Sequence, residues 1–307
     1  MKLIVIGGTG RIGSQVVQKL TAAGHEAVPA APSTGVDLIT GKGLDQALEG
    51  ADVVINVANS PTFDKASIDF FRTSMTNLLA AGERAGVRHQ VILSIVGVDQ
   101  VPEMDYYRAK TLQEDLLRHG PTPYSIVRAT QFFEFMDATL AENSDDTTVR
   151  VPATHLQPIA AADVVDAVVE VATGPPLNGI RNVAGPDVFS LDELGRVTLA
   201  ARHDGRTVIT DDKAGMFAPV TGEVLTAGPD ARLAPTHYQD WLQTAARLPR
   251  LRTERRGMAA SPSQPLCAGH TSGSYLPRFR FVGVACFGGV PPRPAALQES
   301  VARRPRA

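Results

Sequence analysis

The chain has 307 residues, of which 43% are hydrophobic, and a formal net charge of −2, values that are ordinary for a globular protein of one large or two smaller domains. This small net charge gives no overall reason to expect nucleic acid or an anionic membrane as a partner. No apolar run approaches the length of a spanning helix and the N-terminus lacks a signal-peptide layout, so we expect a cytoplasmic protein. With only two cysteines, both beyond residue 260, a disulfide framework or a thiolate metal site in the body of the chain is excluded.

The first thirteen residues predict a strand, a glycine turn and a helix. Residues 1–6 suit a buried strand, residues 11–23 form an amphipathic run, and a second strand-like run follows at 25–30. Gly7, Gly10 and Gly13 supply a sharp turn, room for a pyrophosphate, and close packing of helix on strand. The helix would direct its first N–H groups and its positive dipole end at phosphates. The alternative, a tight connection without a ligand, explains three glycines at this spacing poorly.

The end of the second predicted strand bears on which dinucleotide is bound. In many dinucleotide folds an acidic residue at this place bonds both ribose hydroxyls and repels a 2′-phosphate. Here Ala31 occupies the place, and Arg11, Ser33 and Thr34 are expected nearby. We therefore favour NADP over NAD, although Arg11 could equally be a solvated residue at the start of the helix.

Two further polar residues are candidates for contacts with the cofactor. Asp37 could accept a hydrogen bond from the adenine amino group, with a turn-capping aspartate as the alternative. Residues 52–57 read as a buried strand that is broken at 58–61. Because loops at the carboxyl ends of parallel strands face the ligand crevice, Asn59 is a candidate by its position.

A possible catalytic pair lies farther along the chain. A long helix is predicted over 63–85, a strand over 90–96 with Ser94 near its end, and a helix over 106–118. On that last helix Tyr106 and Lys110 are four residues apart and share one face. A phenol with a pKa near 10 is a poor acid or base at neutral pH, and an adjacent ammonium lowers this pKa. The alternative is an exposed aromatic residue and a solvated lysine.

These motifs resemble the short-chain dehydrogenase/reductase superfamily, and within it the atypical, NmrA-like NAD(P)H-binding branch, over about residues 1–245. The resemblance is carried by Gly7, Gly8, Thr9, Gly10, Arg11, Ile12 and Gly13, by Ser94, Tyr106 and Lys110, and by the run 127–135. It implies an α/β, Rossmann-like, doubly wound parallel sheet. It also implies that Ser94 polarises the substrate oxygen, Tyr106 transfers the proton, and Lys110 holds the nicotinamide ribose. Where many catalytic relatives carry an asparagine this chain has Phe71, and the branch includes members that bind dinucleotide without turnover.

The carboxyl-terminal third is predicted to form a small substrate lobe from about residue 149, with short strands at 149–152 and 157–159, a helix capped by Asp163, a strand at 179–183 and a capping box at 190–193. Residues 246–307 contain eleven arginines, two glutamates and no lysine or aspartate. Because this segment is rich in proline, glycine and arginine and has little hydrophobic periodicity, we predict a disordered tail.

The leading hypothesis is an NAD(P)H-dependent oxidoreductase that transfers hydride to or from a small carbonyl or quinone-like substrate. One alternative is a non-catalytic, NADP-binding, redox-sensing regulatory protein of NmrA type; another is nucleic-acid binding through the arginine-rich tail, which would depend steeply on salt. The sequence indicates no metal site and no oligomeric state. The residues expected to contact the cofactor are Gly7, Thr9, Gly10, Arg11, Ile12, Gly13, Ser33, Asp37, Asn59 and Lys110.

Overall fold

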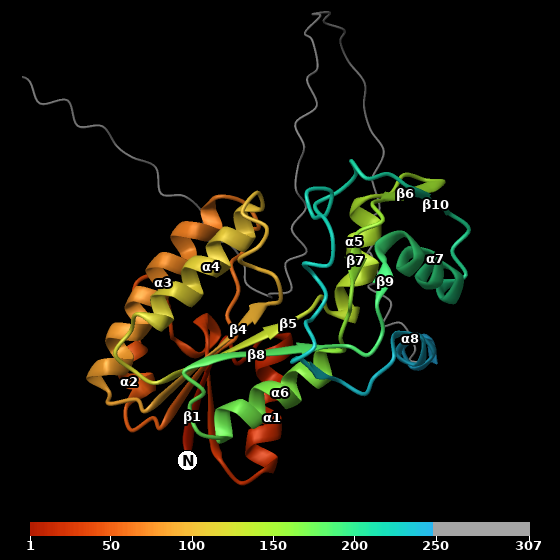
Figure 1. Ribbon diagram of the computed structural model, residues 1–307. Helices are drawn as coiled ribbons and strands as arrows, with labels where there is room; N and C mark the ends of the chain where they lie inside the picture. Colours follow the sequence, from red (N-terminus) through yellow and green to blue (C-terminus); the bar gives the residue numbers. More distant parts are fainter. Residues whose placement is uncertain (248–307) are drawn as a thin grey trace, which may run out of the picture.

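A seven-stranded, all-parallel sheet forms the centre of the computed structural model, which describes residues 1–247 (Figure 1). Its strand order is β11-β8-β5-β4-β3-β1-β2. The strands are β1 (Lys2–Ile6), β2 (Glu26–Ala30), β3 (Val53–Asn56), β4 (His89–Ile95), β5 (Tyr124–Ala129), β8 (Gly179–Ala184) and β11 (Arg232–Leu233). The predicted doubly wound α/β sheet is confirmed, and each of the first four strands begins and ends within one residue of its predicted position.

The order of the strands places a crevice between β1 and β3. After β1 the chain pairs β2 on one side, and it then crosses to place β3 on the other side. The loops that follow β1 and β3 therefore leave the sheet in different directions at its carboxyl edge. In open α/β sheets ligands bind at such a reversal of strand order.

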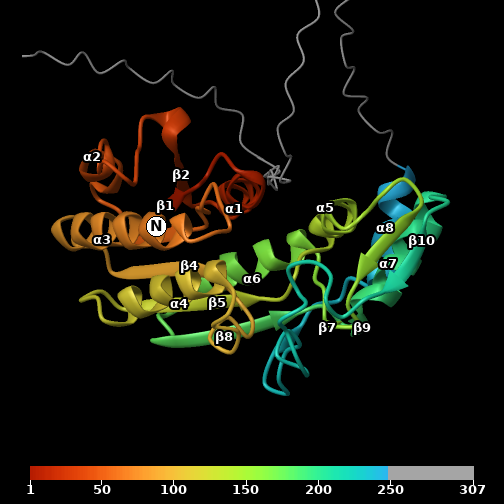
Figure 2. The same ribbon diagram turned by 90° about the horizontal axis from the view of Figure 1, so that it is seen from above.

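Helices cover both faces of the sheet (Figure 2). On one face α1 (Arg11–Ala22) packs beside α6 (Ala161–Thr173), and an ion pair between Lys19 and Asp166 joins them at the surface. The other face carries α2 (Leu44–Leu48), α3 (Ala66–Arg84) and α4 (Asp105–Arg118). Each face has its own buried apolar cluster, as expected when parallel strands are covered on both sides.

A smaller lobe lies beyond the carboxyl edge of the sheet. It contains α5 (Met136–Glu142), α7 (Leu191–Arg202), α8 (Tyr238–Arg247), the β6–β10 pair (Thr148–Val151, Thr207–Thr210) and the β7–β9 pair (His155–Leu156, Phe189–Ser190). The rings of Phe133, Tyr238 and Trp241 pack together at its base. We predicted α6 and β8 within the lobe, but both belong with the central sheet, where α6 lies beside α1 and β8 pairs with β5. The chain therefore crosses between the lobe and the sheet more than once.

Two local predictions need correction. The first concerns α6, whose N-cap is Ala160 rather than Asp163, and the half-buried carboxylate of Glu134 accepts the N–H of Ala161 instead. The second concerns the strand predicted at 157–159, which lies two residues earlier, as β7. Both depend on the approach of a distant segment, which local sequence does not show.

The predicted disordered tail lies outside the described residues except for its first two positions, which end α8. Among residues 1–247, none of the helices combines the length and the apolar character needed to cross a lipid bilayer.

Candidate functional site

The glycine turn after β1 is closely packed against the loop after β3. Gly7 has a φ of +78°, a region that favours glycine, and a Cβ there would lie 2.9 Å from the backbone nitrogen of Ala58. A Cβ on Gly13 would lie 2.2 Å from the carbonyl oxygen of Gly7, so helix α1 can approach the turn only with glycine at this position. The roles predicted for these two glycines, a sharp turn and close helix packing, therefore agree with the geometry.

The amino end of α1 suits an anionic ligand. Gly10 is the N-cap and offers no side chain to the first-turn amides, and the first turn carries no acidic residue. The amides of Ile12 and Gly13 belong to the first helical turn, where the helix supplies no acceptors of its own, and the helix dipole is positive here. A phosphate would supply the missing acceptors.

The segment after β2 lies beside the glycine turn. Ser33 Oγ donates a hydrogen bond to Thr9 Oγ1 at 3.2 Å, which joins two of the predicted cofactor residues. Ala30 ends the strand and Ala31 follows it, so no carboxylate stands at the place where other dinucleotide folds hold the ribose hydroxyls.

Asp37 has the role of a turn-forming aspartate in this structure. Its Oδ1 accepts the backbone N–H of Ile39 at 2.8 Å and that of Thr40 at 3.4 Å. The hydrogen bond from Ile39 is the main reason that the pKa of Asp37 lies below its usual value. This is the alternative we stated for Asp37, and a contact with adenine stays a prediction.

Tyr106, near the start of α4, contacts the loop that follows β3. Its hydroxyl donates a hydrogen bond to Asn59 Oδ1, and its ring lies 4.8 Å from the ring of Phe63, centroid to centroid. Phe71 of α3 packs against the same ring. The side chain is only 9% exposed, and burial raises the pKa of Tyr106 above its ordinary value.

Lys110, one turn farther along α4, is buried among neutral groups. Its Nζ donates to the carbonyl oxygen of Leu93 at 2.7 Å and to the amide oxygen of Gln113, and it lies 4.9 Å above the centre of the Phe71 ring. Burial lowers the pKa of Lys110 to about 7, although the charge of Glu114 acts in the opposite direction. No hydrogen bond joins Lys110 to Tyr106 in the described part of the chain.

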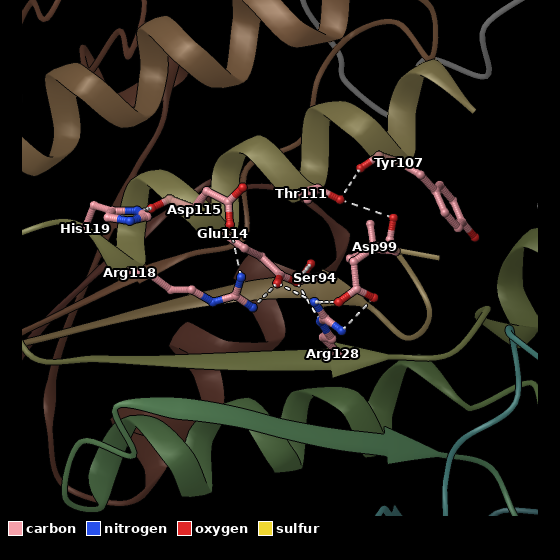
Figure 3. A network of polar contacts seen from close by, with 10 residues as sticks. Ser94, Asp99, Tyr107, Thr111, Glu114, Asp115, Arg118, His119 and Arg128 are labelled. Carbon is pink, nitrogen blue, oxygen red and sulfur yellow. Dashed lines mark hydrogen bonds and ion pairs between the residues drawn. The ribbon is translucent and has the colours of Figure 1, made fainter. Parts of the chain in front are cut away.

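Ser94 belongs to a buried network of charges rather than to the surroundings of Tyr106 (Figure 3). Its hydroxyl donates to Glu114 Oε1 at 2.5 Å. The same carboxylate accepts two bonds from Arg128, at 2.6 and 2.8 Å, and one from Arg118 at 2.8 Å, and Arg128 also pairs with Asp99. Glu114 has no solvent exposure. The structure thus brings Tyr106 and Asn59 together but does not join Ser94 or Lys110 to Tyr106 by hydrogen bonds.

The sequence analysis missed this network, although two signals were present. Arg128 is a charged residue in the otherwise apolar strand 124–129, and Glu114 lies four residues after Lys110 on the same helix. A charge within a buried strand requires a partner. In residues 1–247 no group of three or more His, Cys, Asp or Glu side chains is arranged to hold a metal ion.

The doubly wound sheet and its glycine turn define a Rossmann-type nucleotide-binding protein. The chain belongs to the NAD(P)H-binding family, whose model matches residues 7–175. It therefore binds a pyridine dinucleotide, and the cradle formed by the glycine turn, the amino end of α1 and the Ser33–Thr9 contact fits the diphosphate and ribose of that group. The finer assignment to the NmrA-like branch stays a prediction.

Three known proteins are similar to this chain. The (4-alkanoyl-5-oxo-2,5-dihydrofuran-3-yl)methyl phosphate reductase of Streptomyces griseus subsp. griseus is 31% identical over 143 residues, 42% of this chain and 48% of the reductase. The photosystem II assembly factor Ycf39 of a Synechocystis species is 26% identical over 149 residues, 44% of this chain and 46% of that protein. The chain thus spans about half the length of each relative.

The third is a solved structure, the dTDP-4-dehydrorhamnose reductase of Bacillus anthracis in complex with NADP. It superimposes with a TM-score of 0.58 over 79% of this chain and 97% of the reductase, at 16% identity. At this level of identity the likeness shows the shared fold alone.

Replacing Gly13 with alanine should weaken NADPH binding. The new Cβ would overlap the carbonyl oxygen of Gly7, so helix and turn must separate. Overpacking of this kind costs about 1–3 kcal/mol, and we expect the dissociation constant measured by calorimetry to rise roughly 5–100-fold. Gly205→Ala is the matched control, because a Cβ there meets no atom within 4 Å. Equal affinity of Gly13→Ala and wild type would contradict this account of the turn.

Lys110→Met should change how stability depends on pH in the cofactor-free protein. Between about pH 7 and 10 the unfolded chain keeps the Lys110 proton while the folded chain has lost it, so raising the pH stabilises the fold. Relative to Lys110→Met, the free energy of unfolding of wild type should rise by up to roughly 1.4 kcal/mol per pH unit in this window. Urea denaturation of both proteins measures the difference, and parallel pH curves would refute a buried lysine of depressed pKa.

Proposed function

We propose that this protein is an NAD(P)H-dependent oxidoreductase that transfers hydride between the nicotinamide and a small carbonyl or quinone-like substrate. The observation that carries the proposal is the position of the Tyr106 hydroxyl. It is bonded to Asn59, in the loop after β3, and the preceding residue Ala58 packs against Gly7 of the glycine turn. The loop after β3 thus contacts both the phenol, which can transfer a proton, and the glycine turn of the nucleotide cradle.

Each candidate residue has a distinct part in this proposal. Bound dinucleotide supplies the hydride chemistry. Gly7, Gly13 and the amino end of α1 hold its diphosphate, and Ser33 and Thr9 face the ribose of the adenosine half. Tyr106 gives its proton to the substrate oxygen when a carbonyl is reduced, and takes a proton back in the reverse direction.

Lys110 and Ser94, the other two predicted catalytic residues, are bonded to other groups in this conformation. Lys110 would reach the nicotinamide ribose only after exchanging its bond to Leu93 or Gln113, and Ser94 would reach the substrate only after leaving Glu114. Both therefore stay predictions as contact residues. In the conformation described here, they support α4 and the end of β4.

A preference for NADP over NAD is part of the proposal. The strand β2 ends at Ala30 and is followed by Ala31, so no carboxylate would repel a 2′-phosphate, and the hydroxyl of Ser33 lies beside the glycine turn. Calorimetry with NADPH and NADH tests this preference, and tighter binding of NADH would overturn it.

The test of function uses purified protein and a panel of aldehydes, ketones and quinones. Oxidation of NADPH that depends on both protein and substrate is expected for at least one member of the panel. A protein that binds NADPH and stays inactive across the panel would favour the second candidate, a regulatory protein that binds the dinucleotide without turnover.

That second candidate has two observations in its favour. Tyr106 is almost fully buried and its hydroxyl is already bonded, so the resting site offers the substrate no free phenol. One of the similar proteins is an assembly factor rather than a named reductase. If regulation is the function, a partner protein should bind with different affinity to the NADP- and NADPH-loaded forms.

A further inference from the structure

The direction of the hydrogen bond between Tyr106 and Asn59 can be read from a third group. Asn59 Oδ1 also accepts the backbone N–H of Ser60 at 2.9 Å. A backbone N–H can only donate, so the atom of Asn59 that faces Tyr106 is its oxygen and not its amide nitrogen. Tyr106 therefore acts as the donor, and its phenolic proton is held by Asn59 in this state.

The loop from Ala58 to Lys65 holds Tyr106 at two points. Asn59 binds the hydroxyl, and the half-exposed ring of Phe63 packs on the phenol ring at 4.8 Å. The start of this loop is itself shaped by a carboxamide, because Asn56 Oδ1 accepts the N–H of Ala58 at 3.0 Å. The position of the phenol thus depends on the loop after β3, which is also the loop that meets the dinucleotide turn.

The other two predicted catalytic side chains are bonded to groups other than Tyr106. Ser94 donates to Glu114, and Lys110 donates to Leu93 and Gln113. Phe71 packs against the Tyr106 ring, and its side chain has no oxygen that could accept the phenolic proton. Within residues 1–247, Asn59 is the side chain that hydrogen-bonds the Tyr106 hydroxyl.

We propose that Asn59 is the positioning residue for the proton of Tyr106, a role that rests on the proposed oxidoreductase function. With Oδ1 it holds the neutral phenol in one rotamer. When a carbonyl substrate is reduced, its carbon gains the hydride and its oxygen gains the Tyr106 proton, which leaves a phenolate and an alcohol. If the Asn59 carboxamide then turns and releases the N–H of Ser60, its Nδ2–H group can donate to the phenolate until a solvent proton replaces the one transferred.

An ultraviolet difference spectrum tests the contact without any need for activity. The spectrum of wild type minus that of Tyr106→Phe isolates the absorption of Tyr106, and a phenol that donates a hydrogen bond absorbs at longer wavelength. The spectrum of Asn59→Ala minus that of the Asn59→Ala, Tyr106→Phe double variant should lack this shift of the Tyr106 absorption to longer wavelength. An identical difference spectrum in both backgrounds would overturn the proposal, whether or not the protein is an enzyme.

Kinetics of the full chain test the positioning role. We expect Asn59→Ala to lower kcat roughly 10–100-fold through misplacement of the phenol, while KM for NADPH stays within about twofold. Asn59→Asp should move the alkaline limb of the pH–rate profile upward, because a carboxylate beside Tyr106 disfavours its phenolate form. Asn143→Ala is the matched control, since the Asn143 amide bonds the Thr139 carbonyl in the lobe.

Two kinetic outcomes would count against the role. If kcat and the pH profile of both Asn59 variants match wild type although the spectrum changes, Asn59 touches Tyr106 but does not position it for catalysis. If NADPH binding falls in parallel with kcat, Asn59 acts as a cofactor contact, as the sequence analysis proposed. If the wild type itself shows no turnover, the oxidoreductase function fails and the spectrum alone decides the contact.

Discussion

Replacing Tyr106 with phenylalanine should lower the rate of NADPH oxidation roughly 10²–10⁴-fold, the range that one general acid contributes. The change removes a single oxygen, which bonds Asn59, and leaves a ring that can keep its packing against Phe63 and Phe71. Affinity for NADPH should therefore change little. Steady-state kinetics with any active substrate from the panel, together with calorimetry, measure both quantities.

Tyr124→Phe is the matched control for this variant. Tyr124 begins β5 at the amino edge of the sheet, opposite the crevice, so its hydroxyl should not influence the rate. If the Tyr106→Phe protein is as active as the control, the Tyr106 hydroxyl takes no part in the reaction. A large loss of NADPH affinity would instead assign the hydroxyl to cofactor binding.

The second large effect concerns stability. Glu114→Ala should lower the free energy of unfolding by roughly 3–5 kcal/mol, because it removes the carboxylate that pairs with the buried guanidinium group of Arg128. The lost carboxylate binds Arg128 and Arg118 and accepts the hydroxyl of Ser94. Arg128, which is only 6% exposed, would keep Asp99 as its remaining partner. Since domains are stable by about 5–15 kcal/mol, this variant should unfold at a much lower urea concentration.

An exposed ion pair provides the comparison. Asp45 pairs with Arg84 at 2.6 Å, and both side chains are more than half exposed. Exposed pairs contribute at most about 1 kcal/mol, so Asp45→Ala should shift the urea midpoint only slightly. If the two variants lose similar free energy, the network beneath the crevice is not the buried charge cluster that its geometry indicates.

Much of the fold could be predicted because the determining signals are local. The glycine turn, the apolar runs of β1, β3 and β4, and the 3.6-residue pattern of α1 each depend on neighbours in the chain. Parallel strands covered on both faces read as continuous apolar runs, and their alternation with helices predicts a doubly wound sheet. The lobe was predicted less well, since the assignment of β8 to the main sheet depends on its pairing with β5.

The candidate site was predicted as a set of residues but not as a set of contacts. Tyr106 and Lys110 share a helix face as their spacing requires, but the groups that they meet come from the loop after β3, from β4 and from α3. The partner of Ser94 is on α4, and that of Arg128 is on α4 and on the loop after β4. No periodicity within one segment contains such information.

What the sequence by itself determined is the glycine turn and the helix that begins beside it, because a glycine where no Cβ fits and the helix start that follows are properties of one short segment. Only the tertiary structure decided which groups surround the phenol. Desolvation and hydrogen bonding act between segments that are distant in the chain, and they give Tyr106 its bond to Asn59, leave Lys110 among neutral groups and assign Ser94 to a buried carboxylate.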